Sequence, residues 1–333
     1  MSHGITDTDR MFSTREVPWH KLGTVLEDYP TAAEAKAFAH PWEPVSEPVF
    51  AEEPYISSES GPQVDYVEIA GYQAIRRSDN GQTLGILPTT YSPIQNQTMY
   101  DIAEALEGES NGDVQFETGG SLQGGKRVWL MMKLREPLVI RGDAETATIP
   151  YFALQNSHDG STSFRGQATM TRIVCQNTAQ AADIESKMRG TEFRFRHSSK
   201  VQDRLEQAHE ALAGWRQSIE DYKTFSEHLA SERVGADQAD EFVRRFFPEP
   251  GAAGQVVTER LLANVDASRA EWERIYYSET NEAIRRTRYG LLQASIEYLQ
   301  WNRRAHSEST RFRRTVLDDN ALVKRASKLA QAV

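Results

Sequence analysis

Residues 156–178 carry the residue types that a cysteine-dependent enzyme would use. His158, Asp159 and Ser161 lie close together in this segment, and Cys175, the single cysteine of the chain, follows them. A cysteine nucleophile needs a nearby base and an electropositive setting, which a helix N-terminus often provides. We expect Cys175 where a strand passes into a helix. An enzyme that uses Cys175 with His158 is therefore one hypothesis.

The same segment also has an ordinary structural interpretation. A lone cysteine is usually a small buried apolar residue, and a His-Asp-Gly-Ser run is common in hairpin turns. We therefore expect residues 156–178 to form a strand, a turn at residues 158–160, a second strand and the start of a helix. This structural interpretation is favoured over catalysis.

Metal-binding and nucleotide-binding patterns are missing from the sequence. The 8 histidines are scattered singly, and no His-x-x-x-His motif or pair of cysteines completes a metal site. The run "GGSLQGGK" ends at Lys126, but Arg127 follows where a phosphate-binding loop requires Ser or Thr. We expect no catalytic residue, metal or cofactor, and an enzyme remains the less favoured alternative.

The strand predicted over residues 127–135 has two different faces. Its even positions are all apolar, whereas its odd positions include Arg127, Trp129 and Lys133. Successive side chains of a strand point to opposite faces of the sheet. One face should pack on a core, and the other should be basic with an aromatic residue in its middle.

Basic and aromatic residues also alternate in "EFRFRHSSK", where Phe193 and Phe195 should face one way and the two arginines the other. Proteins hold single-stranded nucleic acid with a basic groove along the backbone and aromatic rings on which bases stack. We therefore predict a nucleic-acid-binding surface. Its candidate residues are Lys126, Arg127, Trp129, Lys133, Arg165, Arg172, Arg194, Arg196 and Lys200.

Composition indicates a protein of the cytoplasm. The chain has 333 residues with a net charge of −10, and it contains no apolar run near the roughly 20 residues that cross a bilayer. The first residues lack the basic start and apolar core of a secretory signal. Charge is uneven, because residues 37–75 contain no Lys or Arg while the end of the chain is rich in them. A basic surface can thus exist on an acidic protein.

Three regions are expected in an α+β protein. Residues 1–62 are rich in proline and should form an irregular arm, since proline interrupts helices. Residues 63–197 should form an antiparallel sheet with packed helices, including a hairpin that turns at residues 79–81. Residues 198–333 should form a region of long helices.

Two long helices are predicted in the C-terminal region. The second should run over residues 268–306. The first has an apolar seam of period 3.5, which is typical of a helix packed along its length against another helix or a neighbouring subunit. The seam consists of Val201, Leu205, Ala208, Leu212, Trp215, Ile219 and Tyr222.

Several motifs in this order resemble the phage and plasmid family known as domain of unknown function 932. They are "PWHKLG", "YSPIQNQTMYDIAEAL", "GGSLQGGKRVWLMMKL", "NSHDGSTSF", "TRIVCQNT" and "FRHSSKVQDRLEQA". The resemblance covers roughly residues 1–225 and implies a protein of phages, prophages or plasmids. More distantly, the expected order of elements is similar to the core of phage single-strand annealing proteins. That similarity implies an oligomeric ring or filament that holds single-stranded DNA without nucleotide hydrolysis.

The leading hypothesis is a homo-oligomeric protein of a bacterial cytoplasm that binds and anneals single-stranded DNA in phage or plasmid recombination. A phage or host recombination protein is a possible partner, and no membrane is involved. One alternative is a protein-interaction or anti-host factor of a mobile element, which would use its acidic stretch and its seam helix. The other is the Cys175-dependent enzyme.

Overall fold

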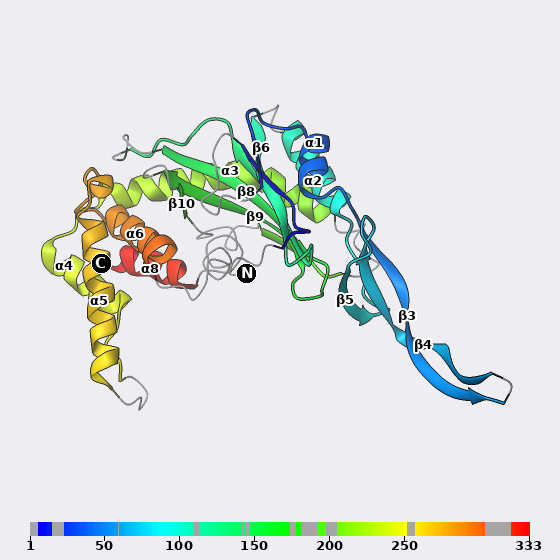
Figure 1. Ribbon diagram of the computed structural model, residues 1–333. Coiled ribbons are helices and arrows are strands. Elements are labelled where there is room, and N and C mark those ends of the chain that lie inside the picture. Colours follow the sequence, from blue (N-terminus) through cyan, green and yellow to red (C-terminus); the bar gives the residue numbers. More distant parts are fainter. Residues whose placement is uncertain are drawn as a thin grey trace.

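The protein is α+β, and we describe it from a computed structural model. Helices cover one face of a central sheet, a long two-stranded ribbon projects from one end, and further helices gather at the other end (Figure 1). The structure describes residues 6–14, 23–58, 60–109, 113–141, 143, 147–173, 178–181, 192–197, 205–251, 257–303 and 321–333.

The central sheet has 8 strands. Seven of them follow the order β10-β9-β8-β7-β6-β1-β2, while β11 pairs with the same edge of β9 as β10 does. All pairs are antiparallel except β1 with β2, so the sheet is mixed. The strands are β1 (Met11–Thr14), β2 (Thr24–Leu26), β6 (Val114–Leu122), β7 (Arg127–Leu134), β8 (Ala147–Ser157), β9 (Phe164–Ile173), β10 (Thr178–Ala181) and β11 (Glu192–Phe195).

The period-two pattern of β7 divides the protein into two apolar clusters. Val128, Leu130 and Met132 belong to the main core, together with residues of the helices. Trp129 and Met131 belong to a smaller cluster on the opposite face. The prediction that the even positions pack on a core is therefore confirmed. The odd positions of β7 lie on the face that does not carry the main core.

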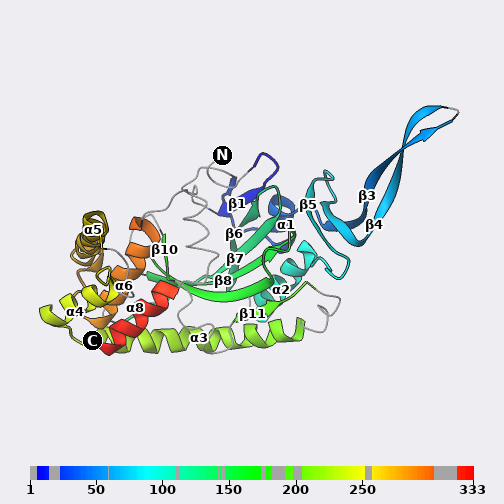
Figure 2. The same cartoon turned by 90° about the horizontal axis from the view of Figure 1, so that it is seen from below.

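Three helices cover the main-core face of the sheet. α1 (Ala32–Ala39) and α2 (Asn96–Glu109) both contact β6, and α3 (Leu205–Ser231) contacts β9 and β11. The helices also contact one another in the order α1, α2, α3. Figure 2 shows α3 running along the length of the sheet. This layer leaves the opposite face, with Trp129, as the place where the predicted basic surface must lie.

The seam of α3 meets the sheet as well as other helices. Trp215, Ile219 and Tyr222 are buried, and the Trp215 ring packs edge-on against Phe152 of β8 at a centroid distance of 5.7 Å. α3 also contacts α2 and α6 (Arg288–Glu297). Val201 and the side chains of Leu205, Ala208 and Leu212 lie outside the described part of the structure. Over the described part of the seam, the apolar face packs against the sheet as well as against other helices.

The single long helix predicted over residues 268–306 is wrong. Instead, α5 (Glu259–Tyr276) ends before a turn with the short helix η3 (Glu279–Asn281), and α6 begins after it. Arg286 adopts a left-handed φ of 63°, and the Thr287 hydroxyl accepts a 3.0 Å hydrogen bond from the Gly290 amide. This hydroxyl caps a new helix. The π-helix η4 (Tyr298–Asn302) continues α6, and the described part of the chain also contains α4 (Ala236–Phe246) and α8 (Ala321–Ala332).

The prediction of an irregular arm over residues 1–62 is wrong for its described part. This region contributes β1 and β2 to the central sheet, supplies α1, and contains the strand β3 (Pro44–Ser57). Proline is compatible with β3 because this strand pairs on one side only, with β4 (Gly61–Arg77). The predicted hairpin between β4 and β5 (Thr83–Pro88) is confirmed, and Gly81 in its turn has a φ of 67°.

None of the helices in the described part of the chain has both the length and the apolar character needed to span a bilayer.

Candidate functional site

One row of residues crosses the central sheet on the face opposite the main core. Trp129 of β7 is paired with Gln155 of β8, Gln155 with Arg165 of β9, and Arg165 with Arg194 of β11. Directly opposed residues on antiparallel strands point to the same face of the sheet. Strand register therefore brings four side chains from four strands together, although they are far apart in the sequence.

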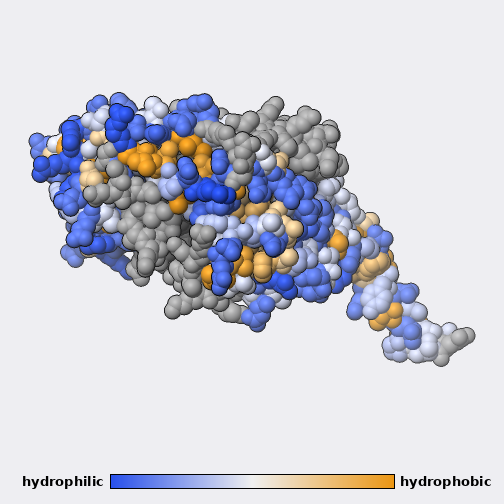
Figure 3. All heavy atoms as spheres, turned by 90° about the horizontal axis from the view of Figure 1, so that it is seen from above, coloured by the Kyte–Doolittle hydropathy of each residue, from blue (hydrophilic) through white to orange (hydrophobic). Residues whose placement is uncertain are grey.

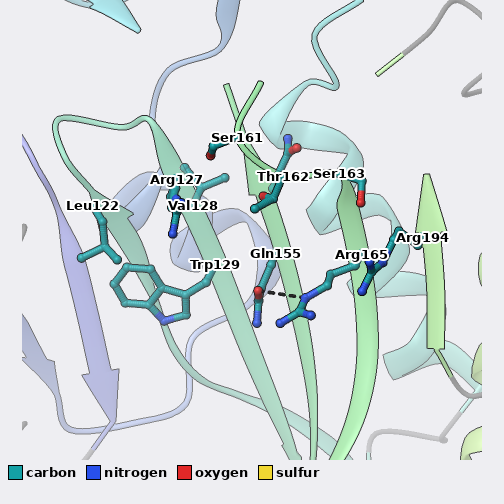
Figure 4. A pocket seen from close by; sticks show the side chains of 11 residues that line it. Leu122, Arg127, Val128, Trp129, Gln155, Ser161, Thr162, Ser163, Arg165 and Arg194 are labelled. Atoms are coloured by element: carbon teal, nitrogen blue, oxygen red, sulfur yellow. Dashed lines mark hydrogen bonds between the residues drawn. The ribbon is translucent and has the colours of Figure 1, made fainter. Parts of the chain in front are cut away.

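These side chains line a pocket of about 440 Å³ (Figure 4). Four of the nine predicted nucleic-acid-binding residues take part in it, namely Arg127, Trp129, Arg165 and Arg194. Three guanidinium groups from three strands thus converge on one cavity. The full lining consists of Leu122, Arg127, Val128, Trp129, Gln155, Asn156, Ser161, Thr162, Ser163, Arg165 and Arg194.

Arg165 forms the buried floor of the pocket with Gln155. Each of these two side chains is 8% exposed, and the Nε of Arg165 donates a 3.1 Å hydrogen bond to Oε1 of Gln155. The acceptor of this bond is a neutral amide, so the bond orients the guanidinium without cancelling its charge. A buried, oriented guanidinium is suited to an anionic ligand because its planar fork matches carboxylate and phosphate oxygens.

Arg127 stands at the start of β7, where it pairs with Leu122 of β6 and Ser157 of β8. Its Nε is buried and has no hydrogen-bond partner among the described residues. An unsatisfied buried donor costs roughly 1–3 kcal/mol. An acceptor atom of a ligand in the pocket would remove that cost.

Trp129 lines the pocket, but its ring is too buried to stack on a nucleic-acid base. The side chain is only 3% exposed. Its indole lies over Gly120 of β6, where an added Cβ would come within 2.6 Å of the ring and 2.5 Å of the Met11 Cβ. Trp129 is one of the residues predicted to contact nucleic acid, and in this structure its ring is packed against the protein. Gly120 is required because any side chain there would occupy the space of the indole.

The predicted alternation in β11 is confirmed. Phe193 and Phe195 are buried in the main core, where their rings stack at a centroid distance of 5.0 Å. Arg194 and Arg196 are exposed on the other side of the strand. Arg194 lines the pocket, whereas Arg196 lies outside its lining. The two buried rings anchor the strand and so hold Arg194 at the pocket.

Lys133 does not join the other candidates. Its Nζ lies 2.7 Å from a carboxylate oxygen of Glu117, and it also lies 4.9 Å from the centre of the Tyr29 ring. Burial acts to lower the pKa of Lys133, but the hydrogen bond and the charge of Glu117 outweigh it and raise the pKa. The predicted phosphate contact is therefore unsupported, because an internal carboxylate already neutralises this lysine.

Three other candidates are not placed at the pocket. Lys126 is half-buried in the turn between β6 and β7 and is not part of the lining. The backbone of Arg172 belongs to β9, but its side chain is outside the described part of the structure, as is the whole of Lys200.

His158 has a structural position that does not suit a catalytic base. It is fully buried, its Nε2 lies 2.9 Å from Oδ1 of Asn96, and its ring packs edge-on against Trp42. Burial lowers the pKa of His158 to about 3, so the ring is neutral near pH 7. The predicted turn after it is confirmed, with Gly160 at a φ of 72°. Cys175 lies outside the described residues, so its pairing with His158 stays a prediction.

Sequence reasoning did not assign the polar part of the lining to the binding surface, and it named Ser161 only for the enzyme hypothesis. Gln155 and Asn156 follow the apolar run of β8, yet they are still buried, at 8% and 2% exposure. Ser161, Thr162 and Ser163 come from the turn between β8 and β9. The one signal in the sequence was the change from apolar to polar residues inside a continuing strand. That change is also typical of the end of a strand, so only the strand register shows that Gln155 lies at the pocket.

Comparison with protein-family models matches residues 83–326 to the family described as Domain of unknown function (DUF932). No curated protein and no solved structure matches the chain. Within the described residues, no group of three or more His, Cys, Asp or Glu side chains is arranged to hold a metal ion. The polar groups that line the pocket are guanidinium groups, amides and hydroxyl groups.

Proposed function

The chain belongs to the DUF932 family, and we propose that it binds single-stranded DNA and promotes strand annealing for a phage or plasmid. In this proposal the DNA backbone crosses the pocket face of the central sheet. Arg127, Arg165 and Arg194 contact phosphate oxygens, and Arg196 extends the basic surface beyond the pocket. In this proposal several copies of the protein act together, without nucleotide hydrolysis.

The convergence of Arg127, Arg165 and Arg194 on one pocket is the observation that carries this proposal. Three guanidinium groups around one cavity offer several hydrogen-bond donors to a single anion. A phosphate group can accept charge-assisted hydrogen bonds from them. The buried Nε of Arg127 is one donor that such a ligand would satisfy.

Pocket size and lining favour a flexible strand over a duplex. A volume of about 440 Å³ is in the range of sites for small ligands, so it suits a single nucleotide unit. The amide of Gln155 and the hydroxyl groups of Ser161, Thr162 and Ser163 offer further donors and acceptors to a phosphate, sugar or base. A single strand can turn one unit into such a pocket, whereas a rigid double helix cannot.

The test is fluorescence anisotropy with a labelled oligo-dT strand at low salt. The wild type should bind, and binding should weaken steeply as salt is added because phosphate contacts release counterions. Arg127→Ala and Arg194→Ala should each weaken binding about tenfold, the value of one lost charged hydrogen bond. Each should also reduce the salt slope by about 0.7, as expected for one lost phosphate contact on a single strand.

Arg260→Ala is the matched control. Arg260 is an exposed arginine of α5, away from the pocket lining, so this variant removes the same charge without removing a pocket contact. It should bind DNA like the wild type. Absence of binding by the wild type at low salt, or an equal loss in all three variants, would overturn the proposal. Mixing complementary labelled strands with the wild type then tests annealing by energy transfer.

A further inference from the structure

The ribbon formed by β3 and β4 extends far beyond the rest of the protein (Figure 1). The two strands pair from Pro44 opposite Arg77 out to Ser57 opposite Gly61. β5 supports only residues 72–76 of β4, so most of the ribbon has two strands alone. We call residues 50–68, the outer part of this ribbon, the arm; this segment is distinct from the irregular arm predicted over residues 1–62. At about 3.4 Å per residue, each strand of the arm extends roughly 25 Å.

Large apolar side chains are exposed on the arm. Phe50, Ile56, Val64 and Tyr66 are 50%, 85%, 48% and 67% exposed, and the pairing register places all four on one face. Tyr55 and Val67 are 47% and 48% exposed and lie on the other face, with Glu53 and Asp65. Figure 3 shows apolar side chains alternating with polar ones along this projection. An isolated two-stranded ribbon is marginally stable in water, and several large apolar side chains exposed together mark a contact site. We therefore expect another surface to bind the arm and bury these apolar side chains.

The arm is also acidic without internal compensation. Glu53 and Asp65 are directly opposed across the two strands, an arrangement in which like charges destabilise the pair. Residues 50–68 contain no Lys or Arg, so the arm itself supplies no basic side chain that could lie between them. Glu52 and Glu68 add two more exposed carboxylates. A basic side chain from outside would remove the repulsion, which indicates a basic partner surface.

A basic surface lies at the opposite end of the same molecule. α8 carries Lys324, Arg325 and Lys328 and no acidic residue. The helix is held in place by α4 and α6, with Arg325 donating to the Arg245 carbonyl oxygen at 2.6 Å and Arg288 donating to the Gln331 carbonyl oxygen at 3.1 Å. Figure 1 shows α8 and the arm at opposite ends. Arg325 and Lys328 are both exposed there.

We propose that the arm of one copy of this chain docks on α8 of a second copy. Glu53 and Asp65 lie against Arg325 and Lys328, and the exposed Tyr55 and Val67, on the same face of the arm as these two carboxylates, are covered in the same contact. The two surfaces differ and lie at opposite ends of one molecule, so the contact is head-to-tail. Repetition of a head-to-tail contact gives a ring if it closes and a filament if it does not. This inference stands independently of DNA binding.

The test is a charge swap read by analytical ultracentrifugation of the full chain at low salt. The wild type should sediment well above the 37.6 kDa of one chain. An arm-reversed variant, Glu53→Lys with Asp65→Lys, and a helix-reversed variant, Arg325→Glu with Lys328→Glu, should each sediment as monomers. Mixing the two variants should restore assembly, because each reversed surface then finds an opposite charge on the other chain.

The control variant combines Glu104→Lys with Glu136→Lys. These exposed carboxylates make the same change in net charge away from the arm, and the variant should assemble like the wild type. Circular dichroism checks that each variant is folded. A wild type that stays monomeric at about 50 µM, an arm-reversed chain that still assembles, or a mixture that stays monomeric would overturn the proposal. The last outcome would assign the arm to another partner.

Discussion

Arg165 and Gln155 face each other across the β8–β9 pair, and the guanidinium Nε donates a 3.1 Å hydrogen bond to the amide oxygen. The neutral Gln155 amide takes the position that a carboxylate would have in an ion pair with Arg165. An amide at this position holds the arginine in place without adding a negative charge of its own.

Replacing Gln155 with glutamate should lower the positive charge of the pocket and so weaken the binding of DNA. The new carboxylate would lie within hydrogen-bonding distance of Arg165 and neutralise it, so the affinity for oligo-dT should fall about tenfold. The measurement is fluorescence anisotropy at low salt. Gln155→Met is the matched control, because it removes the same hydrogen bond without adding charge, and it should weaken binding less. Equal effects of the two substitutions would show that pocket charge does not determine affinity.

Lys133 should matter for stability and not for ligand binding. Lys133→Met leaves the carboxylate of Glu117, 21% exposed, without its cation, and we expect a loss of about 2 kcal/mol in the free energy of unfolding. Urea denaturation measures this loss. The double variant Lys133→Met with Glu117→Gln should recover most of it, since no unpaired charge remains. A large loss of DNA affinity in the single variant at temperatures where it is folded would contradict this assignment.

Gly120 should tolerate no side chain. An alanine Cβ would come within 2.6 Å of the Trp129 indole and 2.5 Å of the Met11 Cβ, and overpacking of this kind costs about 1–3 kcal/mol. Gly120→Ala should therefore lower the melting temperature and alter the environment of Trp129, which near-UV circular dichroism detects. Gly108→Ala in α2 is the control, because no atom lies within 4 Å of its added Cβ. That change should be neutral or slightly stabilising, since alanine favours a helix.

Stability should decrease as the pH falls from about 6.5 toward 4. Burial lowers the pKa of His40 to about 4 and that of His158 to about 3, below the usual value of 6.5. Between these pKa values, each of these histidines is protonated in the unfolded chain but neutral in the folded chain. Each therefore makes the free energy of unfolding fall by about 1.4 kcal/mol per unit of decreasing pH. Above pH 6.5 neither residue changes the stability.

Urea denaturation at a series of pH values between 5 and 7 measures this slope in a range where most carboxylates are ionised. His158→Gln keeps a polar side chain next to Asn96 but removes the titration. The variant can be less stable overall, but its free energy of unfolding should vary less steeply with pH. A slope equal to that of the wild type would show that His158 titrates normally in the folded protein.

Local patterns in the sequence predicted the features that depend on one element at a time. The alternation in β7 separated Leu130 from Trp129, and the alternation in β11 separated Phe193 from Arg194, because a strand sends successive side chains to opposite faces. The turn at Gly81 was predicted for the same kind of reason, since a tight hairpin needs a residue with positive φ. The α+β class follows from such local signals.

Other features depend on contacts that no local pattern contains. The sequence could not show that Lys133 meets Glu117, nor that the prolines of β3 lie in a strand paired on one side only. The break between α5 and α6 depends on Arg286 and Thr287, whose residue types are also common inside helices or loops. Each of these is decided by which partner lies nearby in three dimensions.

The sequence by itself determined that a basic and partly aromatic face exists on a sheet whose other face is core. Only the tertiary structure decided that Arg127, Arg165 and Arg194 meet at one pocket while Lys133 does not. The physical reason is register. A shift of one residue between β8 and β9 would turn Arg165 to the opposite face, and this alignment is set by packing and hydrogen bonds across the whole sheet.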